Sequence, residues 1–306
     1  MKFIAIITPV YVSPDFPSRL ELFDKCVASV HKLGSNGTAH LHIVVDDGST
    51  DPEGINCVLR KYDDHRIRYL RRERKETDLR TASNALNFGI DAVLEGHERI
   101  PEYESISAVT PLHSDDLMYD VSSRAKSLEP AGIGAVVGKI AVYRDGQRVI
   151  HEPDFTLRAR DYVARGIAPY PVASIMWKPG TLKGMKMYNK EKLAGDQRFD
   201  GVYHPGFVNV EDVLVTKLTA LYLCKTKLRI AVSDEVSMAY HYHDDSLRGY
   251  HQDPLRGKTK QDLWHLNSSL MAKMYYELLS WDHVSPQNKR AAVRTAVENG
   301  VRRGIR

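Results

Sequence analysis

The chain has 306 residues, of which 42% are hydrophobic and 27% charged, and its formal net charge is +4. This composition is that of an ordinary folded protein and excludes a disordered chain. The small net charge excludes a dedicated nucleic-acid binder but is compatible with phosphate-bearing ligands. The cysteines, Cys26, Cys57 and Cys224, lack zinc-site or disulfide spacing, and no apolar run is long enough to cross a membrane. We therefore expect a cytoplasmic protein without a transmembrane segment.

Apolar runs alternate with amphipathic patterns along the first 115 residues. Residues 3–7 and 40–45 are predicted to be buried strands, and shorter strands are expected over 66–71 and 105–112. Between these strands, helices are predicted from Ser18 to Gly34, from Pro52 behind the N-cap Asp51, and over residues 79–94. This alternation is typical of a doubly wound parallel sheet that binds nucleotides.

The second half of the chain has weaker patterns. Residues 136–150 have strand-like periodicity around the hairpin signal Asp145-Gly146, and an apolar segment covers residues 171–177. A helix is predicted from Glu211, followed by two short strands over 228–232 and 236–240. Two further helices are expected to end the chain.

Three acidic pairs follow a strand or begin a helix: Asp46-Asp47, Asp115-Asp116 and Glu211-Asp212. A sheet of this class could bring all three to the edge where ligands bind. The second pair suits Mg²⁺ or Mn²⁺ on a diphosphate, and the third suits a general base. Capping of a turn or of a helix N-terminus would also explain each pair, so both interpretations remain open from the residues alone.

Several short motifs occur in the order found in family-2 GT-A glycosyltransferases, a large group of inverting nucleotide-sugar transferases. The closest match is VVDDGSTD, from Val44 to Asp51. The others are Thr8-Pro9-Val10-Tyr11, Asn87-Phe88-Gly89-Ile90, Ser114-Asp115-Asp116, Phe199-Asp200-Gly201 with Val210-Glu211-Asp212, and the segment from Tyr240 to Ser246. The chain resembles this family over about residues 3–250. The resemblance implies an α/β GT-A fold, a Rossmann-like nucleotide-binding sheet flanked by helices, with a helical C-terminal extension.

The resemblance also implies a role for each motif. Tyr11 and Asp47 would bind the nucleoside, Asp47 by accepting the N–H of the base, and Thr8 and Pro9 would line the same site. Asp115 would hold the donor ribose or sugar.

The remaining roles concern the reaction centre. Asp116 and His243 would bind a divalent cation, Mn²⁺ or Mg²⁺, which bridges the donor diphosphate. Asp212 would be the general base that deprotonates the acceptor hydroxyl opposite the leaving group, and this in-line attack would invert the anomeric centre.

The motifs depart from the family pattern at three positions. Val12 replaces the usual Asn, Ser114 replaces the first Asp of the metal motif, and His241 replaces an Arg. Because the first Asp of the motif is missing, Asp116 would be its metal-binding carboxylate. His243 is favoured over His241 as a metal ligand because it holds the motif's His position. Secondary site candidates are Asp46, Glu211, His241, Ser246 and Arg248.

We divide the chain into a GT-A domain, residues 1–247, and a helical extension, residues 248–306. The domain would comprise a donor half, residues 1–118, and an acceptor half, residues 119–247. The arginines of the extension could touch anionic lipid as a peripheral membrane contact, and its apolar helix faces could join copies into a homo-oligomer.

The expected function is metal-dependent inverting transfer of a sugar, with UDP favoured as the donor nucleotide. The acceptor could be a glycan, a lipid-linked sugar or a small metabolite, and no nucleic-acid partner is expected. One alternative is a sugar-nucleotide pyrophosphorylase, but that class has a Gly-rich loop where this chain has TPVYVSPD. The other is a non-catalytic nucleotide- or sugar-binding protein, which would lack the base or the metal-binding acid.

Overall fold

The structure, a computed structural model, describes residues 2–14, 18–35, 39–75, 82–144, 147–152, 174–192, 201–203, 211–241, 286, 287 and 290. Its first elements are β1 (Phe3–Val10), α1 (Ser18–Ser35), β2 (His40–Asp46), α2 (Pro52–Arg60), β3 (Ile67–Arg71), α3 (Ala82–Glu95), the 3₁₀ turn η1 (Tyr103–Ser105) and β4 (Ile106–Pro111). The later elements are β5 (Leu117–Met118), α4 (Ser122–Leu128), β6 (Ile133–Arg144), β7 (Gln147–His151), β8 (Ile175–Trp177), α6 (Pro179–Lys192), α7 (Glu211–Thr226) and β9 (Arg229–His241).

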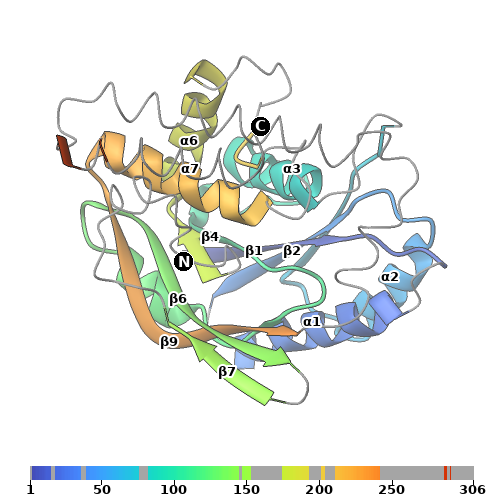
Figure 1. The fold of residues 1–306 in the computed structure, drawn as a ribbon. Coiled ribbons are helices and arrows are strands. Elements are labelled where there is room, and N and C mark those ends of the chain that lie inside the picture. The colour runs from blue at the N-terminus through green and yellow to red at the C-terminus, as the bar shows by residue number, and fades with distance from the viewer. Residues whose placement is uncertain are drawn as a thin grey trace, which may run out of the picture.

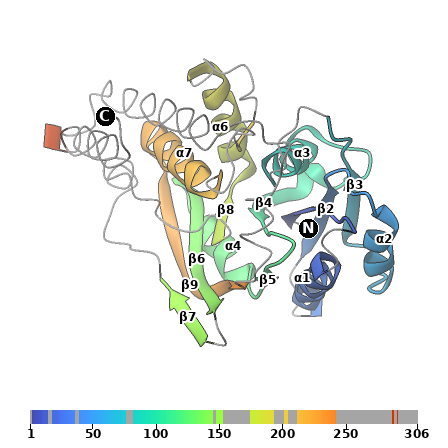
Figure 2. The ribbon, with the colours of Figure 1, turned by 45° about the vertical axis from the view of Figure 1, so that its right-hand side comes forward.

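The strands form one mixed sheet in the order β3-β2-β1-β4-β8-β6-β9-β5, with β7 paired to β6 (Figure 1). The first four strands in this order are parallel. β8 runs antiparallel to both β4 and β6 and joins the two halves of the sheet. The antiparallel pair β6–β7 projects from the half of the sheet that contains β6 and β9 (Figure 2).

Helices cover both faces of the sheet, with α3, α6 and α7 on one face and α1 on the other (Figure 1). The α3, α6 and α7 face has one large cluster of buried side chains, which includes Leu86, Leu182 and Leu218. On the opposite face α1 and α2 share a cluster around Phe23 and Ile55. Burial of both faces explains why consecutive apolar residues occur in β1, over residues 3–7, and in β2, over residues 43–45.

The start of α2 agrees in detail with the sequence. Asp51 is the N-cap, and its carboxylate accepts a hydrogen bond from the Gly54 amide at 2.9 Å. Gly89 of the Asn87 motif permits close packing of α3, because a Cβ there would lie 2.6 Å from Ile7 and 3.0 Å from Val45. The predicted strands and helices of the first half are confirmed, with ends shifted by a few residues.

One prediction for the second half is corrected, and one helix was missed. β9 is one continuous strand rather than two, because a register shift against β6 absorbs the polar residues between Val232 and Val236. α6 was not predicted, although Pro179 at its first position was the available signal. The hairpin turn Asp145-Gly146 and the C-terminal helices lie outside the described residues. Within the described ranges no helix is long and apolar enough to cross a membrane.

Candidate functional site

The loop after β2 is shaped by the first of its two carboxylates. Asp46 is fully buried and accepts hydrogen bonds from the Ser49 amide at 2.8 Å and the Tyr69 hydroxyl at 2.7 Å. Burial, together with this bond to Asp46, raises the pKa of Tyr69 to about 12. Gly48 turns the chain with a φ of 69°, in the left-handed region that favours glycine. Asp46 therefore has the turn-capping role that the sequence left open for it.

The second carboxylate, Asp47, is engaged by two arginines that follow β3. Arg72 Nη1 pairs with Asp47 Oδ1, and Arg74 Nη2 lies 3.2 Å from Asp47 Oδ2. The Arg74 guanidinium carbon also lies 4.9 Å from the centroid of the Tyr11 ring, within cation–π range. We call these four residues the Asp47 cluster. It brings together two residues predicted to bind the nucleoside and two cations.

The pairing of these arginines with Asp47 was not predicted from the sequence. Arg72 and Arg74 are two residues apart just after β3, and both side chains reach the same carboxylate. β3 lies parallel to β2, so the segment after β3 reaches the edge where Asp47 lies. The spacing of the two arginines after a strand was therefore a usable signal.

Thr8 and Pro9 lie within β1, and both are buried. The Thr8 hydroxyl is 2.9 Å from Nε2 of His42 on the neighbouring strand. Burial, and to a smaller extent the neighbouring His40, lowers the pKa of His42 to about 3. Apart from Asp115, four residues were predicted to bind the nucleotide. The structure brings two of them together, Tyr11 and Asp47, whereas the Thr8 side chain lies in the core.

The second acidic pair lies in the loop between β4 and β5. Asp116 is 1% exposed and Asp115 is half-buried. The Asp116 amide donates to the His113 carbonyl at 3.1 Å, which forms a tight turn. At the start of the loop the Leu112 amide donates to the Ile7 carbonyl of β1 at 2.9 Å. Because β1, β2 and β4 are parallel neighbours, the acidic loop and the Asp47 cluster share one edge of the sheet.

The residues of this loop suit a divalent cation carried on a diphosphate. Asp115 and Asp116 offer carboxylate oxygens, and a cation of this kind takes one or two carboxylates and completes its shell with phosphate oxygens and water. Among the described residues no group of three or more His, Cys, Asp or Glu side chains gathers into a full protein shell. His243, the other predicted ligand, lies outside the described residues.

The third acidic pair begins α7, with Asp212 in its first turn, but the side chains of Glu211 and Asp212 lie outside the described part of the structure. The helix is held to β8 by a hydrogen bond of 3.1 Å from Trp177 Nε1 to the Thr219 hydroxyl. His241 is the last residue of β9, and its side chain is likewise not described. Ser246 and Arg248 lie outside the described residues.

Asn87 of α3 anchors the short segment that follows Phe199-Asp200. Its Oδ1 accepts from the amides of Val202 at 3.0 Å and Tyr203 at 2.8 Å, and its Nδ2 donates to the Tyr203 carbonyl at 2.7 Å. A Cβ on Gly201 would lie 2.4 Å from the Asn87 amide nitrogen, so only glycine fits. Two motifs that lie 114 residues apart, at Asn87 and Gly201, are therefore one structural unit.

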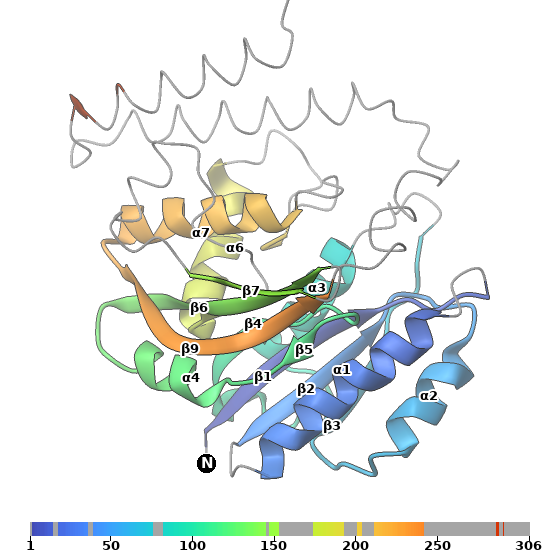
Figure 3. The same ribbon diagram turned by 60° about the horizontal axis from the view of Figure 1, so that its bottom comes forward.

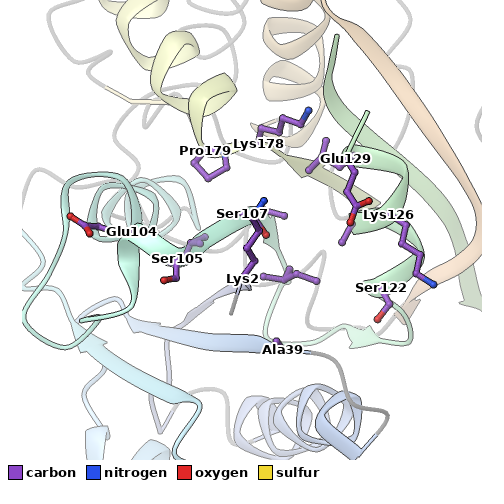
Figure 4. Close-up of a pocket in the computed structure, with 15 residues that line it drawn as sticks. Lys2, Ala39, Glu104, Ser105, Ser107, Ser122, Lys126, Glu129, Lys178 and Pro179 are labelled. Carbon is purple, nitrogen blue, oxygen red and sulfur yellow. The ribbon is translucent and has the colours of Figure 1, made fainter. Parts of the chain in front are cut away.

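A cavity of about 970 Å³ lies at the opposite, amino edge of the sheet. Its floor is apolar, with Ile4 and Ile106 among its residues. The charged side chains at its rim do not converge, because Glu104, Lys126 and Lys178 point away from one another (Figure 4). A binding site needs convergent polar groups, so this cavity is not the candidate site.

No protein-family model matches this sequence, and no curated protein is detectably similar to it in sequence. Its fold, however, is similar to solved structures. S. aureus TarS 1–349 in complex with UDP-GlcNAc has a TM-score of 0.63 at 15% identity, covering 100% of this chain and 76% of that chain. A second structure of TarS 1–349 has a TM-score of 0.61 at 15% identity, covering 98% of this chain and 72% of that chain.

The fold is GT-A. The predicted α/β class, with a nucleotide-binding type of sheet flanked by helices, is thereby confirmed, and so is the resemblance to GT-A glycosyltransferases at the level of the fold. In the GT-A fold of this chain, Asp47 follows β2 and the acidic loop follows β4, the two parallel strands on either side of β1.

Proposed function

We propose that this protein transfers a sugar from a nucleoside diphosphate to an acceptor hydroxyl. The observation that carries the proposal is the shared sheet edge of the Asp47 cluster and the Asp115-Asp116 loop in a GT-A fold. Their strands, β2 and β4, flank β1, so their ends are two strand spacings, roughly 10 Å, apart. A nucleoside diphosphate can bridge that distance, with its base at one end and its phosphates at the other.

In this proposal the Asp47 cluster binds the nucleoside. Asp47 accepts an N–H of the base, and the Tyr11 ring provides a flat apolar surface beside it. Arg72 and Arg74 hold the Asp47 carboxylate in one orientation through charge-assisted hydrogen bonds. Their positive charges also favour an anionic ligand at this edge.

The acidic loop holds the diphosphate end of the donor. Asp116, together with His243, would bind Mn²⁺ or Mg²⁺, and Asp115 would hold the ribose or the donor sugar. When bound, the cation supplies Lewis-acid neutralisation of the charge that develops on the leaving nucleoside diphosphate.

Asp212 is the proposed general base. It takes the proton of the acceptor hydroxyl while the acceptor oxygen forms a bond to the anomeric carbon. The bond from that carbon to the diphosphate oxygen breaks, and the nucleoside diphosphate leaves with the electron pair. Because attack and departure are on opposite sides, the anomeric configuration is inverted. UDP is the favoured nucleotide, and the TarS complex with UDP-GlcNAc supports testing it first.

Thermal unfolding with UDP, GDP or TDP, each with and without Mn²⁺, tests the donor site. We expect UDP with Mn²⁺ to stabilise the protein by about 2.7 kcal/mol at 100 times its Kd. Asp116→Asn should lose the Mn²⁺-dependent part of this effect, because a carboxamide is a weak cation ligand. Asp234→Asn, which changes an exposed aspartate of β9, is the matched control and should keep it.

Turnover of UDP-GlcNAc separates catalysis from binding. Asp212→Asn should lower kcat by about 10²–10⁴-fold while UDP stabilisation remains, since the base touches the acceptor and not the nucleotide. Stabilisation by UDP without turnover with any acceptor would favour a non-catalytic binding protein. If no nucleotide stabilises the protein in either metal condition, the donor site is refuted.

A further inference from the structure

Two side chains of α1 contact the loop that carries Asp115 and Asp116. The Cys26 thiol donates to the His113 carbonyl with an Sγ–O distance of 3.6 Å, at the start of the loop. The Ser29 hydroxyl accepts a hydrogen bond from the Met118 amide at 3.0 Å, just after the acidic pair. We call Cys26 and Ser29 the α1 anchor. Figure 3 shows α1 beside β5, the strand that Met118 ends.

Both contacts are directionally defined. The Ser29 hydroxyl donates its proton to the Cys26 carbonyl at 2.6 Å, so its lone pairs face the Met118 amide. Burial, followed by the carboxylates of Asp116 and Asp115, raises the pKa of the Cys26 thiol well above its usual value. The thiol is therefore protonated at neutral pH and available as a donor to His113.

The helix that carries the anchor is itself rigidly packed. Its inner side chains, among them Phe23, Val27 and Val30, are fully buried against the sheet, and so is Cys26. The backbone is thus bonded to α1 on both sides of the acidic pair. Within the loop, the hydrogen bond from the Asp116 amide to the His113 carbonyl closes a tight turn. A loop without these contacts would let the two adjacent carboxylates separate, because like charges repel.

We infer that Cys26 and Ser29 are positioning residues that hold the Asp115-Asp116 loop in the arrangement in which Asp116 can bind a divalent cation. This inference rests on the proposed function, because it assigns the anchor to the loop that carries the proposed metal ligand, Asp116. Residues that orient metal ligands without touching the metal commonly change metal affinity by about 10–100-fold. We assign the α1 anchor to this group of residues that orient a metal ligand. Neither Cys26 nor Ser29 belongs to any of the motifs identified in the sequence.

The test measures Mn²⁺ binding to the full chain with UDP present, by electron paramagnetic resonance of free Mn²⁺. Ser29→Ala and Cys26→Ala should each raise the Mn²⁺ Kd about tenfold. UDP binding in the presence of EDTA should change less than about twofold in both variants, because the Asp47 cluster is untouched. Ser29→Thr, which keeps the hydroxyl, should restore the Mn²⁺ Kd.

Each variant has a matched control elsewhere in the core. Ser83→Ala makes the same change on α3, where the buried hydroxyl has no hydrogen-bond partner among the described residues. Val27→Ala makes a similar cavity next to Cys26 in sequence but on the α2 side of the helix. Hydrogen exchange of the Met118 amide should quicken in Ser29→Ala and stay unchanged in Ser83→Ala.

The outcomes separate this inference from the proposed function. If the unaltered protein binds Mn²⁺ with UDP and the anchor variants bind it as the controls do, the inference alone is overturned. If the unaltered protein shows no Mn²⁺ binding with UDP, the proposed metal site fails and the inference fails with it. If the anchor variants lose Mn²⁺ affinity and UDP affinity in EDTA to the same extent, the substitutions have damaged the fold in general. That result would also overturn the inference.

Discussion

Asp46 and Asp47 are consecutive, yet their carboxylates have different surroundings. Side chains alternate along a strand, so one carboxylate turns toward Tyr69 and the other toward Arg72 and Arg74. Asp46 has both oxygens satisfied by groups that shape the turn. Asp47 is paired with Arg72 and Arg74, and the Arg74 guanidinium in turn lies over the Tyr11 ring. We therefore propose Asp47, rather than the secondary candidate Asp46, for direct contact with the nucleotide.

His42 gives the protein a pH-dependent term in its stability. Its folded-state pKa of about 3 lies below the ordinary value, chiefly because the ring is buried beside Thr8. Below pH 6.5 the unfolded chain therefore binds a proton that the native protein does not. The free energy of unfolding should fall as pH decreases, by up to about 1.4 kcal/mol per pH unit from this residue.

Urea unfolding at several pH values between 7 and 5 checks this prediction. His42→Gln should flatten the decline by up to about 2 kcal/mol over that range. His65→Gln, at an exposed histidine, should leave the decline as it is in the unaltered protein. Equal pH dependence in His42→Gln and His65→Gln would contradict the assignment to His42.

At the scale of elements, α3 forms polar contacts with two segments of the second half of the chain. Asn87 makes three hydrogen bonds to the backbone of Val202 and Tyr203, and Lys186 of α6 bonds Asp91 of α3 at 2.7 Å. These contacts bind segments that lie about a hundred residues apart, and the segment held by Asn87 lies shortly before α7. The start of α7, which carries the proposed base, thus follows a firmly anchored stretch of backbone.

Asn87→Ala should detach this stretch. Three backbone groups would lose their partner, which we expect to lower the free energy of unfolding by about 1–3 kcal/mol. Amide exchange of Val202 and Tyr203 should quicken in the native protein. Asn84→Ala, on the same helix, is the control for the change in side chain. Unchanged protection of Val202 and Tyr203 in Asn87→Ala would show that other contacts hold the segment.

At the scale of the whole molecule, the sheet does not stop at the boundary that we propose between donor and acceptor halves. β4, in the donor half, pairs with β8 through Val109 and Trp177. One core cluster also combines Ile4 and Ala108 with Val136 and Met176. The two halves therefore share one sheet and one core. The Asp47 cluster and the Asp115-Asp116 loop nevertheless lie entirely within residues 1–118.

Residues 1–118 alone should not form a stable unit. Without β8, strand β4 becomes an open sheet edge. The apolar side chains that pack against the second half, Ile4 and Ala108 among them, become exposed to water. Circular dichroism during urea titration should show no cooperative transition for this fragment. Residues 1–247, the proposed complete domain, should keep one. A cooperative transition in the short fragment would mean that the donor half folds independently.

The sequence by itself determined the class of the fold and the order of its first elements. Strands buried on both faces are rich in consecutive apolar residues, and helix caps such as Asp51 are local signals, so both can be read along the chain. The turn chemistry after Val45 likewise identified the loop that carries Asp46 and Asp47. These features depend on neighbours within a few residues, which is the range over which periodicity and capping operate.

The tertiary structure alone decided which functional groups meet. Arg72 and Arg74 reach Asp47 because β3 lies beside β2 in register. Cys26 and Ser29 bond the backbone on either side of Asp115 and Asp116, at His113 and Met118, because α1 packs beside β5. The merging of two expected strands into β9 likewise follows from pairing with β6. Such contacts join residues 25 to nearly 100 positions apart, and they depend on strand register and packing, which local patterns do not specify.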